Sequence, residues 1–555
     1  MSNMFESHRA LLDKAIAATR TRDNWSAYPE SASPRIYGET ARADGEAAFR
    51  ALLNAPFDLP GHPAGAQAGA EVSPYGFALG ISYPQATVDA LVAASAAAGA
   101  AWGAASVEAR AGVLMEILAR LNARSFLIAN AVSHTSGQAF AMAFQAGGPH
   151  AQERALEAVA YAYEAMTRTP GAATWAKQTG KDQITTIGKT FRIVPRGVAL
   201  AIGCATFPTW NTYPGMFASL ATGNPVIVKP HPGAILPLAI TLKIAREVLK
   251  EQGFDPNVLL LAPDTADRPL TKDLALHPDV AIVDFTGSNA FGQWLREHAR
   301  GKLVYTEEAG INSIVIDSTD NLRGMLSNVA FSLSLYSGQM CTAPQNIFIP
   351  AGGIETEQGH KTFDEVAGAL KISVDKLLGD PDRAAGILGA VQADATIQRV
   401  KDAARTGTVL RASDAPAYAD APGARTASPL ILVVDAADEA AYMAERFGPI
   451  AYVIRSGNTA ESLARAAGAA RSHGAISAGL YSTSEAVIAA AADAFAEAGV
   501  TLSVNLTGGV FVNQNAAFSD FHVTGANPAG NACLTDAAFV ANRFRVVGVK
   551  RQVAA

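Results

Sequence analysis

One cysteine in the sequence has the surroundings of a reactive thiol. Cys341 follows Tyr336-Ser-Gly-Gln-Met340, a segment of a glycine and small polar residues. A thiol on such a turn can be ionised, and the backbone N–H groups beside it can bind a developing oxyanion. A single cysteine in an apolar chain is more often a small core residue. Cys204 and Cys533 are expected to be structural.

Two carboxylates, Glu307 and Glu308, follow the apolar run Leu303 to Tyr305. If that run is a strand of a parallel sheet, its carboxyl end faces the crevice where ligands bind. A pair of solvated loop residues explains the same pattern equally well. The pair of carboxylates by itself therefore does not distinguish a binding site from a solvated loop.

Two further segments can receive an anion. In Phe285-Thr-Gly-Ser288, followed by Gly292, a strand ends in small residues before a helix, and free N–H groups at a helix start favour a phosphate. Ser288 can equally be an ordinary N-cap. In Gly223-Asn-Pro-Val-Ile-Val-Lys-Pro230, a buried strand ends at Lys229, which either reaches the surface or meets an anionic ligand.

The order of apolar runs shows what must position these groups. Short runs predicted as strands alternate with helical segments between residues 198 and 305, and a second block of the same texture spans about 310–515. This alternation indicates an α/β fold with doubly wound parallel sheets. Residues 1–80 are rich in turn-forming clusters and are expected to form a loosely structured arm, followed by packed helices over 88–166. Residues 184–187 and 190–194 are expected to form a hairpin around Gly188-Lys189, and residues 541–553 an edge strand.

Composition excludes several classes of protein. The chain has 555 residues, 49% of them hydrophobic, a formal net charge of −6 and three cysteines. Nucleic acid is therefore not an expected partner, and a disulfide framework is not expected. The charged N-terminus and the prolines within the longest uncharged run, 197–228, argue against a signal sequence and a membrane span, so we expect a cytoplasmic protein with no membrane partner. The G-x-G-x-x-G fingerprint and the usual zinc-ligand spacings are missing from the sequence, and no metal site is expected.

Taken together and in order, these elements resemble the aldehyde dehydrogenase superfamily over residues 85–550. The motifs that carry the resemblance are Gly-Asn…Lys-Pro, Phe-Thr-Gly-Ser, Glu-x-x-Gly, Gly-Gln-x-Cys and Glu-x-Phe-Gly-Pro, the last as Glu445-Arg-Phe-Gly-Pro449. Within the superfamily, the long N-terminal arm and Cys204-Ala-Thr-Phe-Pro208 look like the PaaN branch of phenylacetate degradation.

The resemblance implies a role for each motif residue. Cys341 would attack the aldehyde and form a thiohemiacetal, which passes hydride to a nicotinamide and becomes a thioester. Glu307 would be the general base, which favours release of a carboxylate over transfer to coenzyme A. The dinucleotide would be held by a set of residues from both blocks: Lys229, His231, Gly287, Ser288, Glu445 and Phe447.

Two positions depart from the family pattern. Pro232 stands where NAD-preferring members often carry a glutamate, so a 2′-phosphate on the cofactor would meet Lys229 and His231 without repulsion; we expect NADP, with NAD as the alternative. Counting back from Asn224 places Thr206 where the family has an asparagine that stabilises the oxyanion. Asn211 can compensate only if the loop bends differently, and its spacing argues against that. The remaining alternatives are that Thr206 donates in place of the amide, or that the backbone N–H of Cys341 binds the oxyanion alone.

The resemblance also implies an organisation and partners. We expect an N-terminal arm (1–80), a cofactor-binding domain (81–170 and 196–306), a catalytic domain (307–515) and a small β element for oligomerisation (171–195 and 535–555). A homodimer or homotetramer is expected.

The expected function is oxidation of a small-molecule aldehyde, a semialdehyde of aromatic catabolism that can be coenzyme A-linked. The alternatives are a cysteine-dependent thioester hydrolase or acyltransferase without redox chemistry, and a non-catalytic subunit. In the Ala517 to His522 segment, which replaces a glycine-rich family motif, His522 is expected on a surface loop, with a place at the entrance of the site as the alternative.

Overall fold

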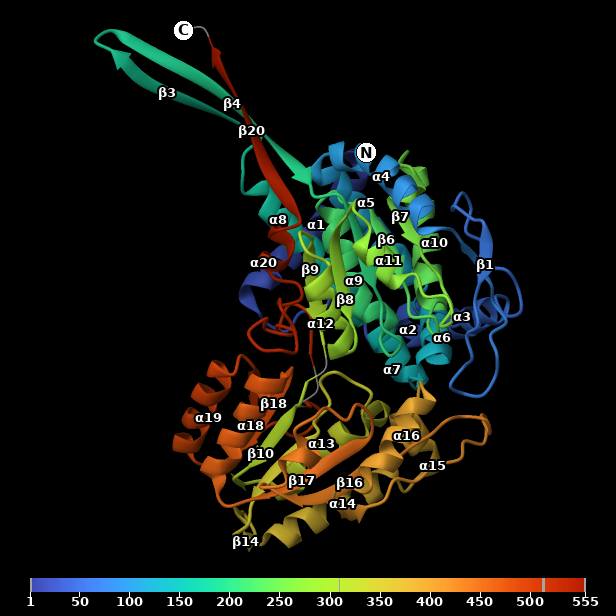
Figure 1. The fold of residues 1–555 in the computed structure, drawn as a ribbon, viewed down its shortest axis with the longest axis vertical. Helices are drawn as coiled ribbons and strands as arrows, with labels where there is room; N and C mark the ends of the chain where they lie inside the picture. The colour runs from blue at the N-terminus through green and yellow to red at the C-terminus, as the bar shows by residue number, and fades with distance from the viewer. Residues whose placement is uncertain (1, 309, 512–514, 554–555) are drawn as a thin grey trace.

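The computed structural model describes residues 2–308, 310–511 and 515–553. Two α/β lobes are stacked along the long axis, and a narrow β arm projects from the upper lobe (Figure 1). The lobes are joined where β9, Leu303–Glu307, leads into β10, Ser313–Ile316. The site residues named above cluster around this junction.

The upper lobe is built on a parallel sheet of five strands in the order β7-β6-β5-β8-β9. Its strands are β5 Val198–Ile202, β6 Val226–Lys229, β7 Leu259–Leu261, β8 Val280–Thr286 and β9. The connecting helices are α9 Pro208–Ala221, α10 Leu236–Glu251, η2 Pro256–Val258, α11 Thr271–Leu276 and α12 Asn289–His298. The central strands are buried on both faces, as expected for runs without alternation. The predicted parallel α/β fold is confirmed.

A further set of helices packs mostly on α9 and α10, and the first helix of the set contacts β5, β6 and β7 directly. The set comprises α4 Val88–Ala104, α5 Val107–Ala123, α6 Ser125–Ser136, α7 Phe140–Gln145, η1 Ala146–His150 and α8 Ala151–Thr167. In the described residues no single helix has the length and apolar character of a membrane span. Only α4 and α5 together pass that test by length and composition, and the pair is bent by 117°.

The N-terminal segment is more ordered than its composition predicted. It forms α1 Ser2–Thr21, α2 Pro34–Tyr37 and α3 Ala41–Arg50, followed by β1 Ala66–Ala68 and β2 Tyr83–Gln85. Phe5 and Leu12 of α1 are buried in the main core, and Phe5 stacks on Tyr163 of α8 with ring centroids 5.7 Å apart. The prediction of a loosely structured arm is wrong here, because apolar residues of α1 pack against α5 and α8.

The lower lobe contains a seven-stranded sheet in the order β15-β16-β17-β12-β10-β18-β19, parallel except for the edge strand β15. Its strands besides β10 are β12 Asn346–Pro350, β15 Thr408–Arg411, β16 Leu430–Asp435, β17 Ile450–Ser456, β18 Ser477–Tyr481 and β19 Thr501–Val504. Its helices are α13 Leu322–Ser334, η3 Leu335–Gly338, α14 Phe363–Leu378, α15 Pro381–Leu388, α16 Asp394–Ala403, α17 Glu439–Tyr442, α18 Thr459–His473 and α19 Glu485–Glu497. A small sheet adds β11 Ser318–Thr319, β13 Ile354–Thr356 and β14 Gly359–Lys361.

The projecting arm is an antiparallel sheet of β3 Ala172–Gly180, β4 Gln183–Pro195 and, after α20 Ala537–Ala541, β20 Phe544–Val553. The expected hairpin around Gly188-Lys189 is wrong: β4 runs straight through these residues, and the turn lies at 181–182, between β3 and β4. The expected C-terminal edge strand is present as β20, which pairs with β4. Apolar side chains on this arm, such as Ile184, Val547 and Val549, are exposed. Oligomerisation through the arm stays a prediction.

Candidate active site

The turn that carries Cys341 has an unusual backbone. Tyr336, Ser337 and Gly338 all have positive φ angles, of 52°, 50° and 61°. Non-glycine residues rarely adopt this conformation, and they keep it only where the surroundings hold them in place. Here Ser337 Oγ donates to the backbone oxygen of Leu388 at 3.0 Å or of Ala427 at 2.9 Å. The turn is therefore fixed before any ligand arrives.

Two neighbouring residues explain why this turn needs its glycine and how the cysteine after it is held. A Cβ on Gly338 would lie 2.4 Å from the backbone oxygen of Gly448, so no other residue fits. On the other side, Asn312 Nδ2 donates to the backbone oxygens of Cys341 at 2.8 Å and Ala343 at 2.9 Å. The thiol is thus held at the junction between the lobes, half-buried and open to two cavities.

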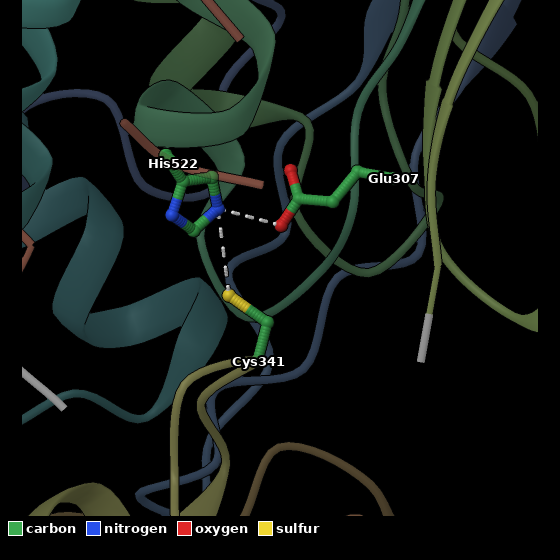
Figure 2. Close-up of side chains that lie close together, drawn as sticks. All are labelled: Glu307, Cys341 and His522. Carbon is green, nitrogen blue, oxygen red and sulfur yellow. Dashed lines mark hydrogen bonds and ion pairs between the residues drawn. The ribbon is translucent and has the colours of Figure 1, made fainter. Parts of the chain in front are cut away.

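Cys341 lies in a cluster with Glu307 and His522 (Figure 2). His522 Nε2 is 2.9 Å from Glu307 Oε1 and 3.9 Å from Cys341 Sγ. The other carboxylate oxygen, Oε2, accepts from Asn211 Nδ2 at 2.9 Å. The carboxylate thus has a partner on each oxygen, and both partners lie next to the thiol cavity.

The electrostatics of the cluster favour an ionised Glu307 and a neutral thiol. Burial by itself raises the pKa of Glu307, but attraction to His522 and hydrogen bonds from His522, Cys341 and Asn211 bring that pKa below its usual value. Burial and the charge of Glu307 raise the pKa of the Cys341 thiol well above its ordinary range. The resting site therefore contains a base beside a protonated nucleophile, which is the state that precedes general-base catalysis.

The same three residues are also donor types that zinc accepts. Their reactive atoms lie within 4.8 Å of one another. Tetrahedral zinc holds nitrogen and oxygen ligands roughly 3.3–3.5 Å apart, judging from its bond lengths, whereas His522 Nε2 and Glu307 Oε1 are separated by only 2.9 Å. The spacing fits a hydrogen-bonded acid–base cluster better than a metal centre, and the expectation of no metal stays a prediction.

A cavity of about 540 Å³ lies on one side of Cys341. All of the residues that sequence analysis assigned to catalysis or the cofactor line it: Thr206, Lys229, His231, Gly287, Ser288, Glu307, Cys341, Glu445 and Phe447. Its far end is formed by the start of α12, where Ser288 is the N-cap and accepts from Phe291 N at 3.4 Å. The cavity thus joins a helix N-terminus to the thiol, which fits an extended ligand with a phosphate group at its middle.

Lys229 occupies the predicted position but already has an anionic partner. Its Nζ is 2.7 Å from Asp264 Oδ1, and both side chains are buried. From the sequence, this lysine was expected to be free for a 2′-phosphate, and no motif pointed to Asp264. Because Asp264 follows β7 and Lys229 ends β6, only the strand order brings them together. His231 lies exposed at the cavity beside them.

Glu445 and Phe447 enter the cavity from the lower lobe. Arg399 of α16 fixes their loop by donating to the backbone oxygen of Phe447 at 2.5 Å. Burial raises the pKa of Glu445 to about 7, although a hydrogen bond from the backbone of Gly310 and the charge of Arg399 act in the opposite direction. A ligand that donates hydrogen bonds to this carboxylate, such as a ribose, stabilises its ionised form.

A second cavity, of about 100 Å³, reaches Cys341 from another direction. Its wall includes Phe207, Trp210 and Asn211, together with Met142 and His522. It is a mainly apolar pocket that four polar residues besides the thiol also line, namely Asn211, Thr342, Asn515 and His522. Such a lining is expected for the reacting end of a small carbonyl compound.

The sequence named two further residues of the site but favoured other places for them. His522 was expected on a surface loop, but its side chain is only 1% exposed and lies against Trp210 and Glu307. Asn211 was set aside on spacing, yet it lies in the first turn of α9, whose start at Pro208 directs its amide toward Glu307. Thr206 lines the larger cavity, and its backbone oxygen accepts from Gln138 Nε2 at 2.8 Å. The one sequence signal for His522 was its place between apolar Phe521 and Val523.

Comparison with known proteins agrees with this geometry. Residues 81–526 match the model of the aldehyde dehydrogenase family. A crystal structure of an NAD-dependent aldehyde dehydrogenase from Burkholderia multivorans is 56% identical, covers 100% of this chain and 99% of its own, and superposes with a TM-score of 0.98. A 1-pyrroline-5-carboxylate dehydrogenase from Thermus with bound NAD is 19% identical, covers 96% of this chain and 99% of its own, and shares the fold with a TM-score of 0.73.

Curated relatives match over shorter stretches. A 1-pyrroline-5-carboxylate dehydrogenase from Bacillus licheniformis is 28% identical over 222 residues, 38% of this chain and 39% of that protein. The aldehyde dehydrogenase LUC3 from a Fusarium species is 27% identical over 272 residues, 48% of this chain and 54% of that protein. The match thus spans about half the length of these relatives or less. On the family match, which covers most of the chain and includes the Cys341 turn, the protein belongs to the aldehyde dehydrogenase family.

Proposed function

We propose that the protein oxidises an aldehyde to a carboxylate with a nicotinamide dinucleotide, through a covalent intermediate on Cys341. The observation that carries the proposal is the place of the thiol, at the meeting point of a dinucleotide-sized cavity and a smaller apolar one, beside an ionised carboxylate. A redox-neutral hydrolase needs no cavity of the first kind. The B. multivorans structure, described as an NAD-dependent aldehyde dehydrogenase, supports the same assignment.

The chemistry follows from the residues around the thiol. Glu307 takes the thiol proton, and the sulfur of Cys341 forms a bond to the aldehyde carbon, whose oxygen becomes an oxyanion. The nicotinamide, when bound, accepts the hydride, which leaves a thioester on Cys341. Glu307 releases the thiol proton to solvent and then accepts a proton from a water that attacks the thioester. The C–S bond breaks, the carboxylate product leaves, and the Cys341 thiolate takes up a proton to restore the resting thiol. Absorbance at 340 nm on mixing protein, aldehyde and dinucleotide tests the proposal: a rise is expected, and hydrolysis of a thioester without any such rise would favour the redox-neutral alternative.

For the substrate, we propose a semialdehyde from aromatic catabolism that can carry a coenzyme A thioester. The support is the resemblance of the N-terminal arm and the Cys204 to Pro208 segment to the PaaN branch. The apolar wall of the small cavity, with Phe207 and Trp210, is compatible with such a compound. A panel of short, aromatic and thioester-linked aldehydes should show the highest kcat/KM for the last group.

The preferred dinucleotide depends on Asp264. The sequence favoured NADP because Pro232 offers no repulsive carboxylate, but the ion pair with Asp264 occupies the lysine that would meet the phosphate. We therefore propose a preference for NAD, with NADP accepted more weakly. Asp264→Asn is expected to free Lys229 and to tighten NADP binding by about tenfold or more, since a charge-assisted hydrogen bond contributes roughly 1.5–3 kcal/mol. Fluorescence titration with both dinucleotides measures this, and equal tightening of both would mean that Asp264 does not select between them.

Asn211 is proposed as the side-chain donor to the oxyanion. One of its amide hydrogens is used by Glu307, and the other remains for a ligand in the small cavity. Asn211→Ala should lower kcat by about 10²–10³, the usual cost of losing one such donor, whereas Thr206→Ala should change kcat far less. If Thr206→Ala has the larger effect in single-turnover assays, the oxyanion lies on the Thr206 side.

The raised pKa of Glu445 predicts a pH-dependent affinity for the dinucleotide. With a pKa of about 7, the side chain is an ionised acceptor for ribose hydroxyls above that pH and is increasingly protonated below it. The dissociation constant should therefore rise as pH falls from 8 to 5.5, by up to about tenfold per unit below the pKa. Glu445→Gln should bind with a constant that is flat over this range, and an equally steep profile in that variant would assign the effect elsewhere.

A further inference from the structure

His522 is the least expected member of the catalytic cluster. Its ring is almost fully buried. It forms a T-shaped contact with the indole of Trp210, with ring centroids 4.5 Å apart and ring planes at 78°. Nε2 faces Glu307 Oε1 at 2.9 Å and Cys341 Sγ at 3.9 Å, as the dashed lines of Figure 2 show. A single ring nitrogen thus points at both the base and the nucleophile.

The loop that carries His522 is anchored by a buried ion pair on α8. Arg154 Nη1 lies 2.8 Å from Glu157 Oε2 and also donates to the backbone oxygen of Asp520 at 3.1 Å. Glu157 Oε1 accepts from the backbone N–H of Phe518 at 3.1 Å. These contacts fix the chain on the N-terminal side of His522, so the position of the ring is set by the fold and not by the ligand.

The hydrogen bonds assign the proton on Nε2. An ionised carboxylate only accepts, so a nitrogen 2.9 Å from Glu307 Oε1 must carry a hydrogen. The other nitrogen, Nδ1, is buried without a hydrogen-bond partner among the described residues. The ring therefore has one placed hydrogen and two acceptors within reach of it: the carboxylate in the resting site, and the sulfur once that sulfur is ionised.

We propose that His522 is a catalytic residue that donates its Nε2 hydrogen to Glu307 in the resting enzyme and to the Cys341 thiolate during reaction. When the thiol ionises, the S–H bond breaks and an O–H bond forms on Glu307, which then no longer attracts the imidazole as an anion. His522 transfers no proton in this step. Its Nε2–H only changes hydrogen-bond acceptor, from the carboxylate oxygen of Glu307 to the sulfur of Cys341. The inference rests on the proposed role of Cys341 as nucleophile, and it explains how a thiol beside a carboxylate can be ionised at all.

Alkylation of the thiol tests the inference without aldehyde or dinucleotide. Iodoacetamide is added to the full-length protein in buffer with EDTA between pH 6 and 10, and labelling of each cysteine is followed by mass spectrometry. The titratable groups that face Cys341 or influence its charge are Glu307, His522, Cys204 and Glu445. His522→Leu keeps the bulk of the ring without a donor, and His522→Gln keeps an N–H donor. Labelling at Cys533 serves as the internal control.

The expected result is specific to a donor. His522→Leu should slow alkylation of Cys341 at pH 7 by about 10–100-fold and raise the pH midpoint of labelling, whereas His522→Gln should recover part of the rate. The dissociation constant for the dinucleotide should stay unchanged in both. Wild-type rate and midpoint in folded His522→Leu would overturn the inference. If the leucine variant does not fold, equal slowing in His522→Gln and His522→Ala would overturn it too, because a donor would then make no difference.

Failure of the proposed function is distinguishable from failure of this inference. If the wild-type protein reduced no dinucleotide with any aldehyde of the panel, the proposed oxidation would be wrong. The alkylation profiles would still report whether His522 stabilises the thiolate. Conversely, normal oxidation with unchanged alkylation in His522→Leu would leave the function in place and remove the histidine from it.

Discussion

Replacement of Cys341 by alanine should abolish aldehyde oxidation, with kcat lower by a factor of about 10⁴ or more, the scale seen when a covalent nucleophile is removed. The sulfur is the atom that bonds to the aldehyde carbon, and the cluster around it offers no second nucleophile, since Cys204 Sγ is tied to Asn211 Oδ1 at 3.5 Å and burial raises the pKa of Cys204 to about 11. Dinucleotide binding should be retained, because most of its cavity lies away from the thiol. Steady-state assays and a binding titration measure the two effects.

The matched control is Cys533→Ala, which alters a buried thiol outside both cavities. It should oxidise aldehyde at close to the normal rate, with at most a modest loss of stability from a small core cavity. Residual activity of more than a few percent in Cys341→Ala would mean that hydride can leave without a thiohemiacetal on this sulfur.

Replacement of Glu307 by glutamine should give the second largest effect, a loss of about 10²–10⁴ in kcat, as expected for a general base. The loss should fall on the hydrolysis of the thioester more than on its formation. The negative charge of Glu307 contributes to the raised pKa of the Cys341 thiol, so glutamine removes part of the barrier to ionisation. Rapid mixing should therefore show one equivalent of reduced dinucleotide per site, formed more slowly than in the wild type because the thiol proton must pass to solvent, followed by almost no turnover.

Glu297→Gln on the exposed side of α12 is the control for this variant, since its side chain bonds only with Gln293 in the described contacts. It should behave as the wild type. If Glu307→Gln instead shows no first equivalent and normal hydrolysis of added acyl-enzyme, the carboxylate serves the first half of the reaction alone.

The sequence predicted the fold correctly where buried strands appear as continuous apolar runs. Val198 to Ile202 and Val226 to Val228 are continuous apolar runs, and both lie in inner strands of the upper sheet. The turn in the arm was misplaced because the pair Gly188-Lys189 is typical of a hairpin turn, and the local sequence does not show that β4 continues through it. The packing of α1 into the core was not predicted, because the short helical patterns of residues 1–80 do not show that this helix lies against α5 and α8.

The sequence predicted the site residues that belong to local motifs. It did not predict those that only the tertiary structure brings to the site. Cys341 follows a turn that contains Gly338, and Glu307 is the last residue of β9, so local motifs identified both. His522 approaches them from a loop near the C-terminus that is placed by Arg154 and Glu157 of α8, and no local pattern encodes that contact. Asp264 meets Lys229 only because β6 and β7 are neighbours in the sheet. Sequence spacing misled for Asn211, since distance along the chain does not fix the direction of the first turn of α9.

The most direct test of the central claim is rapid-quench mass spectrometry of the protein after mixing with aldehyde and dinucleotide. The peptide that contains Cys341 should gain the mass of the acyl group within the first turnover, in step with one equivalent of absorbance at 340 nm, and should lose it as the carboxylate appears. Reduced dinucleotide formed while Cys341 stays unmodified, or an acyl group found on another residue, would contradict the account.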